Sequence, residues 1–126
     1  MELRLLGGTG VKVSALAHGT MSFGGDTDET AAAAPYRRAR EAGISFFDCA
    51  DVYERRKSEE ILGRLIAHEC DDILLTTKAY FPMGTDAIAR GATRRHLVRA
   101  LEASLRRLGT DRVDVFYVHR FHYGAR

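Results

Sequence analysis

Three short apolar runs in this sequence each lead directly into a side chain that can carry out proton chemistry. They are residues 44–47 before Asp48, 73–77 before Lys78 and 113–118 before His119. Near-continuous apolar runs of this length are typical of strands buried on both faces, as in a parallel sheet. Stretches of helical periodicity separate them, so the predicted order alternates strands with helices. Because the carboxyl ends of parallel strands share one side of a sheet, where ligands bind, we expect these three residues to converge.

The start of the chain predicts a β-hairpin. Two short extended segments, 3–6 and 11–13, flank the glycine-rich sequence Gly7-Gly8-Thr9-Gly10, which is typical of a hairpin turn. Residues 14–19 are a weaker strand candidate, and residues 20–25 are predicted to form a loop.

The first predicted helix contains a proline. It is expected to start near the capping residues Asp26–Asp28, to run to about Ala42 and to stop at Gly43. Pro35 lies inside this range, where a proline removes a hydrogen bond and costs about 3 kcal/mol. We therefore expect either a kink at Pro35 or a helix that effectively begins near it.

Two further helices are predicted, one after Ser58 and one from Thr93 to Gly109. Each has an apolar stripe at helical spacing. The stripes consist of Ile61, Leu62, Leu65 and Ile66, and of Leu97, Leu101, Leu105 and Leu108. The arginines around the last helix fall opposite its leucines, so we expect them to form a solvated face. They are Arg90, Arg94, Arg95, Arg99, Arg106 and Arg107.

The composition fits one soluble domain. The 126 residues are 45% hydrophobic and 29% charged, with a net charge of +2, so neither nucleic acid nor an anionic membrane is an expected partner. Cys49 and Cys70 show no metal-ligand spacing and no disulfide framework, which favours the cytoplasm and predicts no metal site. No signal peptide is evident, and no apolar stretch approaches the ~18 residues of a membrane span.

Tyr53 extends the predicted cluster, because it follows Asp48 by five residues. A phenol with the ordinary pKa of about 10 is too weak an acid near neutrality, but an ammonium group in contact with it favours the phenolate and lowers that pKa. A carboxylate paired with the lysine keeps it charged and in place. An imidazole beside the phenol can orient a carbonyl group. Asp48, Tyr53, Lys78 and His119 therefore suit proton donation to a carbonyl oxygen during reduction by hydride.

Several motifs resemble the aldo-keto reductase family. The sequence Phe47-Asp48-Cys49-Ala50-Asp51-Val52-Tyr53, followed by Ser58-Glu59-Glu60-Ile61-Leu62-Gly63, is similar to that family's signature around its catalytic tyrosine. Residues 6–14 resemble its opening hairpin and residues 19–24 its first strand-end loop. Residues 103–111, leading to Tyr117-Val118-His119-Arg120, resemble its third helix and fourth strand.

The resemblance implies a role for each matching residue. Tyr53 would be the general acid, Lys78 and Asp48 its tuning pair, and His119 the group that orients the carbonyl. The cofactor would be NADPH and the substrate a small carbonyl compound. The residues implied near the nicotinamide end of the cofactor are Gly19, Thr20, Met21 and Asp48.

The resemblance also implies the fold, an eight-stranded (β/α)₈ TIM barrel of typically ~250 residues. This chain accounts for an N-terminal β-hairpin, about four parallel strands and three helices, so residues 1–126 are expected to form a single incomplete α/β domain, the N-terminal half of such a barrel. Its exposed edges favour self-association. The sequence also departs from the family pattern at Glu54-Arg55-Arg56, where a glycine usually follows the tyrosine.

Three functional interpretations stay open at this stage. The first is an NADPH-dependent reductase of aldehydes or ketones, represented here by a truncated chain. The second is a non-catalytic, NADPH-binding regulatory protein of the same fold, like the potassium-channel β subunits. The third is an inactive fragment.

Overall fold

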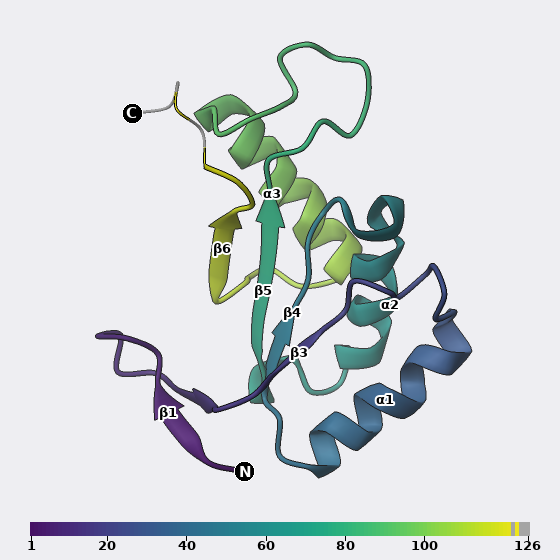
Figure 1. The fold of residues 1–126 in the computed structure, drawn as a ribbon, viewed down its shortest axis with the longest axis vertical. Coiled ribbons are helices and arrows are strands. Elements are labelled where there is room, and N and C mark those ends of the chain that lie inside the picture. The colour runs from purple at the N-terminus through teal and green to yellow at the C-terminus, as the bar shows by residue number, and fades with distance from the viewer. Residues whose placement is uncertain (122, 124–126) are drawn as a thin grey trace.

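Four parallel strands form the centre of the molecule. The computed structural model describes residues 1–121 and 123. The strands are β3 (Ala17–Gly19), β4 (Phe46–Asp48), β5 (Leu74–Ala79) and β6 (Val115–Val118), in that spatial order (Figure 1). In the register of the sheet, Asp48 is aligned with Gly19 on one side and with Thr76 on the other. All four carboxyl ends therefore lie at the same end of the sheet, as the sequence predicts.

The two central strands are more buried than the outer ones. Phe47 on β4 and Leu75 on β5 are almost fully buried. On β6, by contrast, Tyr117 is 38% and Val118 48% exposed. The prediction of burial on both faces is therefore wrong for β6, because this strand is the last of the described sheet and no described strand pairs with its outer edge.

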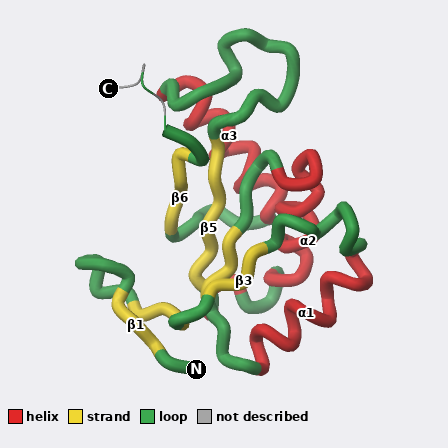
Figure 2. The backbone as a smooth tube through the Cα atoms, in the orientation of Figure 1, coloured by secondary structure: helices red, strands yellow, loops and turns green. Residues whose placement is uncertain are grey.

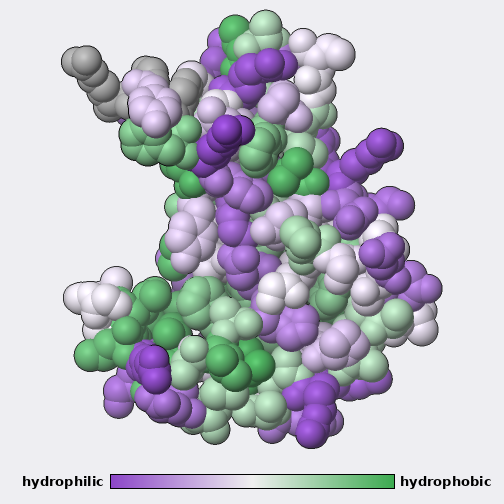
Figure 3. Space-filling model, viewed as in Figure 1, coloured by the Kyte–Doolittle hydropathy of each residue, from purple (hydrophilic) through white to green (hydrophobic). Residues whose placement is uncertain are grey.

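The predicted hairpin is confirmed and lies at the amino-terminal end of the sheet (Figure 1). Its strands are β1 (Leu3–Leu5) and β2 (Lys12–Ser14), which pair in antiparallel fashion. Ser14 and Ser45 exchange hydrogen bonds between backbone N–H groups and side-chain hydroxyls, which ties the hairpin to the residue before β4. Leu3 and Leu5 remain more than half exposed. Figure 3 shows hydrophobic side chains gathered over this hairpin, below a hollow on the side of β6.

Three helices lie on one side of the sheet, as Figures 1 and 2 show. They are α1 (Glu29–Glu41), α2 (Lys57–Ile66) and α3 (Arg94–Leu108). The core between helices and sheet contains one or more buried side chains from each helix, among them Tyr36, Leu62 and Leu108, packed with Phe47 and Leu75. A turn at Tyr53–Arg56 precedes α2, and a short 3₁₀ segment at Cys70–Asp72 precedes β5. A long loop, residues 80–93, joins β5 to α3 (Figure 2).

Helix α1 runs through Pro35 without interruption, so the alternative start near Pro35 is wrong. The helix begins after Asp28, whose side chain accepts a hydrogen bond from the N–H of Ala31. Ala32 and Tyr36, on either side of the proline, are both buried. A proline inside a helix costs one backbone hydrogen bond. The free energy gained by burying this face, above all the large apolar surface of the Tyr36 ring, offsets that cost.

The arginines of α3 do not form a uniformly solvated face. The Arg107 side chain is only 13% exposed and pairs with Glu59 of α2, whose side chain is fully buried. The sequence-based prediction is therefore wrong for Arg107. The half-buried leucines of α3 explain the difference, because the face turned toward the protein is centred on His96, Ser104 and Leu108.

Candidate active site

The strand period of two places Asp48 of β4 and Thr76 and Lys78 of β5 on the face opposite the helices. Phe47 points to the core beneath the helices, so its neighbour Asp48 projects from the other face. Thr76 and Lys78 share this face on β5, since they lie one and three residues after the core residue Leu75. The alternation of side chains therefore brings the carboxylate, hydroxyl and ammonium groups together.

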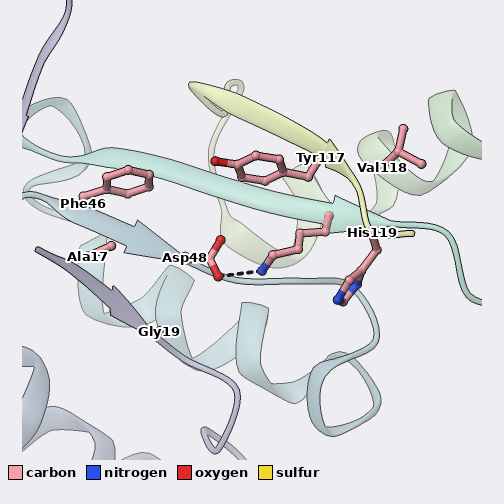
Figure 4. Close-up of a pocket in the computed structure, with 8 residues that line it drawn as sticks. Ala17, Gly19, Phe46, Asp48, Tyr117, Val118 and His119 are labelled. Atoms are coloured by element: carbon pink, nitrogen blue, oxygen red, sulfur yellow. Dashed lines mark hydrogen bonds and ion pairs between the residues drawn. The ribbon is translucent and has the colours of Figure 1, made fainter. Parts of the chain in front are cut away.

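Lys78 is the centre of the cluster. Its Nζ donates hydrogen bonds to Asp48 Oδ2 at 2.6 Å, to the carbonyl oxygen of Cys49 at 2.7 Å and to the hydroxyl of Tyr53 at 3.0 Å. Figure 4 shows the ion pair as a dashed line. On the other side of the carboxylate, Thr76 Oγ1 donates to Asp48 Oδ1 at 2.7 Å. Both oxygens of Asp48 are thus bonded, which fixes the position of the lysine.

Tyr53 reaches this cluster through the turn after β4. The N–H of Asp51 donates to the carbonyl of Lys78 at 3.0 Å, and the N–H of Tyr53 donates to the carbonyl of Ala50 at 3.2 Å. The turn is therefore attached to the end of β5, beside the lysine. Three residues with positive φ follow: Glu54 at 43°, Arg55 at 52° and Arg56 at 82°. Residues other than glycine rarely adopt positive φ values, so the backbone of the turn next to Tyr53 is strained.

His119 completes the cluster from the residue after β6. Its ring meets the Tyr53 ring edge-on, with centroids 5.8 Å apart, and it meets the Phe81 ring similarly at 5.2 Å. The N–H of His119 donates to the carbonyl of Ala79, which continues the pairing between β5 and β6. The expected convergence of Asp48, Tyr53, Lys78 and His119 is thus observed.

The surroundings shift the pKa values of Lys78 and His119, the two basic groups of the cluster, in opposite directions. Burial on its own lowers the pKa of Lys78, but the hydrogen bonds to Asp48 and Tyr53 outweigh it, so the net pKa is raised. Burial, together with the positive charge of Lys78, lowers the pKa of His119. At neutral pH the lysine is therefore an ammonium ion and the histidine a neutral imidazole.

A cavity of about 570 Å³ lies along the uncovered face of the sheet (Figure 4). Its lining includes Gly19, Asp48, Lys78, Tyr117 and His119. Tyr53 is not among the lining residues and borders the cavity through its hydrogen bond to Lys78.

The residues implied in cofactor binding lie in different surroundings. Gly19 and Asp48 line the cavity, whereas Met21 is 66% exposed at the surface. Thr20 is fully buried, where its hydroxyl donates a hydrogen bond to the carbonyl of Asp48 and its own carbonyl accepts one from the hydroxyl of Ser58. Thr20 therefore holds the strand ends together and presents no surface to a ligand.

The cavity fits one end of NADPH. A Cβ added at Gly19 would meet nothing within 4 Å, so there is open space beside the Asp48 carboxylate and the Lys78 ammonium group. This space suits a flat, polar ring such as nicotinamide. Among the residues that line the cavity, the ammonium of Lys78 is already paired with Asp48. The phosphates of a dinucleotide would therefore need groups outside this lining.

Sequence reasoning missed Thr76 and Glu59. Thr76 orients Asp48, and a polar residue in an otherwise apolar strand is a signal that could have identified it. Glu59 accepts a 2.6 Å hydrogen bond from Thr77, next to Lys78, and pairs with Arg107. No pattern within α2 indicates that partner, because 48 residues separate the two in sequence.

Within residues 1–121 and 123, no helix has the length and apolar character needed to cross a membrane. In the same part of the chain, no group of three or more His, Cys, Asp or Glu side chains is placed to hold a metal ion.

Comparison with known proteins gives a consistent result. The family model described as "Aldo/keto reductase family" matches residues 15–125. A rice (Oryza sativa subsp. japonica) protein described as "Probable voltage-gated potassium channel subunit beta" is 38% identical in an alignment of length 124 that covers 95% of this chain and 38% of that protein. "Uncharacterized oxidoreductase YrpG" of Bacillus subtilis is 38% identical in a gapped alignment of length 130, which covers 94% of this chain and 40% of that protein.

A solved structure extends the likeness to the fold. The holo form of aldo-keto reductase AKR11C1 from Bacillus halodurans is 34% identical and superposes with a TM-score of 0.80, over 92% of this chain and 39% of that one. The chain thus spans about two fifths of the length of these relatives, and its fold is part of a (β/α)₈ barrel.

Proposed function

This chain belongs to the aldo/keto reductase family, and we propose that it supplies the proton-donating half of an oxidoreductase that uses NADPH to reduce aldehyde or ketone carbonyls to alcohols. The observation that carries the proposal is the chain of hydrogen bonds from Asp48 through Lys78 to the hydroxyl of Tyr53. Residues 1–126 form a single, incomplete domain in this proposal.

Tyr53 is the general acid. NADPH, when bound, supplies a hydride to the carbonyl carbon. The carbonyl oxygen, as it gains negative charge, accepts the proton of the Tyr53 hydroxyl, and Tyr53 is left as a phenolate. Lys78 Nζ lies 3.0 Å from that phenol oxygen, so its positive charge stabilises the phenolate, and a proton from solvent restores the phenol.

Asp48 and its neighbours are positioning groups for the lysine. Asp48 keeps Lys78 charged through the 2.6 Å ion pair, while Thr76 holds the second carboxylate oxygen. The carbonyl of Cys49 accepts a hydrogen bond from a second N–H of the ammonium group. With these acceptors in place, the third N–H of Lys78 is directed at Tyr53.

His119 orients the substrate. As a neutral imidazole with its ring edge against Tyr53, it can donate one hydrogen bond to the carbonyl oxygen that Tyr53 protonates. A neutral donor places the oxygen without adding a second positive charge beside Lys78.

The second candidate is a regulatory protein that binds NADPH without turnover. The rice relative at 38% identity, described as a potassium-channel β subunit, favours it. The strained Glu54–Arg56 turn also favours it, because a charged, bulky segment stands directly after the proposed acid.

The test compares Tyr53→Phe with Tyr123→Phe, in this chain and in a chimera where residues 15–125 replace the matching segment of the B. halodurans reductase. Tyr123 is 93% exposed, so its substitution removes a hydroxyl without touching the site. We expect Tyr53→Phe to lower NADPH consumption with aldehydes by about 10²–10⁴-fold, with Tyr123→Phe unchanged.

The outcomes separate the two candidates. Turnover by Tyr53→Phe equal to that of the parent chimera would exclude Tyr53 as the acid. A chimera that binds NADPH as tightly as the parent reductase but consumes none, with every aldehyde tested, would favour the regulatory function.

A further inference from the structure

A second cavity, of about 260 Å³, lies behind the turn that carries Tyr53. It shares no lining residue with the cavity around Lys78. The residues with charged or polar side chains that line it are Asp51, Arg56, His96, Arg99 and Arg107. The loop between β5 and α3 closes one side through Met83, Gly84 and Ala89.

Two buried polar atoms in this cavity lack partners. Asp51 is 1% and His96 6% exposed. Among the described residues, neither Oδ1 of Asp51 nor Nε2 of His96 has a hydrogen-bond partner. Buried polar groups are nearly always bonded in folded proteins, so the two atoms indicate that something polar occupies the space between helix and loop.

The charge of the lining selects the sign of the occupant. Three guanidinium groups and one carboxylate, that of Asp51, line this cavity, and Glu59 is close enough to act on Asp51. Arg107 is already bound to Glu59 and Ser104. Arg56 makes one long contact, 3.4 Å, to the carbonyl of Met83. The guanidinium groups of Arg56 and Arg99, at the mouth of the cavity, are therefore available to a ligand with negative charge.

The size of the cavity limits the occupant further. A water molecule takes about 30 Å³ of liquid volume, so 260 Å³ holds a small ion with a few waters and excludes a nucleotide.

We propose that this cavity is a binding site for a small tetrahedral oxyanion of the sulfate or phosphate class, held by Arg56 and Arg99 at the mouth and by the imidazole of His96 inside. When the Asp51 side chain is ionised, its carboxylate repels the bound anion. Arg56 follows Tyr53 by three residues and ends the strained turn, so a bound ion restrains the segment that carries the proposed acid. The site stands independently of the reductase proposal.

Asp51 gives the site a dependence on pH. Burial and the nearby charge of Glu59 raise the pKa of Asp51 to about 6, against the pull of Arg107 and Arg56. Burial lowers the pKa of His96, so this imidazole is neutral at pH 7 and can act there as a neutral hydrogen-bond donor. Below about pH 6 the protonated carboxyl no longer repels an anion and can donate a hydrogen bond to it.

The test is a calorimetric titration of the 126-residue chain with sodium sulfate near neutral pH, at constant ionic strength. Sulfate is the probe because its own charge does not change in this range. We expect saturable binding with a dissociation constant of about 1 mM or lower. Arg99→Gln should weaken it roughly fivefold or more, whereas Arg106→Gln, a matched change on an exposed arginine of the same helix, should not.

Asp51→Asn provides a test that misfolding cannot imitate. It keeps the size of the side chain and removes the repelling charge, so sulfate should bind roughly fivefold more tightly at neutral pH. The proposal is overturned by titrations that do not saturate, by equal weakening in Arg99→Gln and Arg106→Gln, or by an Asp51→Asn chain that binds no more tightly than wild type.

Discussion

The stability of this chain depends on Arg107, because its guanidinium group forms a buried ion pair with Glu59. The carboxylate of Glu59 is fully buried, with one oxygen accepting from Arg107 Nε at 2.6 Å and the other from Thr77 Oγ1 at 2.6 Å. These bonds join α2, α3 and β5. Arg107→Met removes the guanidinium group but keeps much of the apolar stem, so the main perturbation is a carboxylate left without its cation.

The expected loss is large. Breaking a buried ion pair by removing one partner typically costs 3–5 kcal/mol. Since Thr77 still donates one hydrogen bond to the carboxylate, we expect the lower end of this range, about 3 kcal/mol. A small domain has a free energy of unfolding of roughly 5–15 kcal/mol, so this one substitution would remove a substantial share of it.

Urea unfolding followed by circular dichroism measures the difference. Arg106→Met, at the exposed neighbouring position, should change the free energy of unfolding by no more than about 0.5 kcal/mol. The double variant Glu59→Met/Arg107→Met should recover most of the loss, because it leaves no buried charge. An Arg107→Met chain within about 1 kcal/mol of wild type would refute the reasoning.

Two further predictions concern the chain alone. Burial raises the pKa of Asp51 from 3.8 to about 6, so on raising the pH through this window the unfolded state loses its proton first and stability falls. Asp51→Asn should therefore raise the free energy of unfolding by about 2–3 kcal/mol at pH 7 and by little near pH 4, in sulfate-free urea titrations. The chain should also self-associate, because β3 and β6 are unpaired edges of the described sheet. It should bind NADPH weakly, because the one ammonium group in the cavity lining, that of Lys78, is already paired with Asp48 and is not free to bind the phosphates. Light scattering that shows a monomer, with micromolar NADPH affinity by calorimetry, would contradict both expectations.

Features with a local cause could be predicted from the sequence. Asp28 and Thr93 each accept a hydrogen bond from the third residue beyond them, and Gly109 ends α3 with a positive φ of 67°. Such capping depends on a few neighbouring residues, so a sequence pattern suffices. The convergence of Asp48, Lys78 and His119 was also predictable, since parallel strands fix where their carboxyl ends lie.

Long-range competition explains what was missed. At Pro35 the local rule predicts a break, but the buried face formed by Ala32, Tyr36 and Ala39 extends on both sides of it. That face exists only when β4 and α2 are packed against it, through contacts such as that between the tilted rings of Tyr36 and Phe47, whose centroids are 5.0 Å apart. The propensity of one residue was therefore outweighed by burial that only the assembled fold provides.

The turn after Tyr53 shows where local preference and the site are in conflict. Glu54, Arg55 and Arg56 have positive φ values that glycine adopts more readily. The turn persists because its start is attached to β5 through the bond from Asp51 to Lys78 and its end leads into α2, where Ser58 donates to the carbonyl of Thr20 at 2.7 Å. The same attachments direct the Tyr53 hydroxyl at Lys78. Strain that the surrounding bonds overcome is a feature of functional segments, so the departure from the family's glycine lies where it affects the placement of the proposed acid most directly.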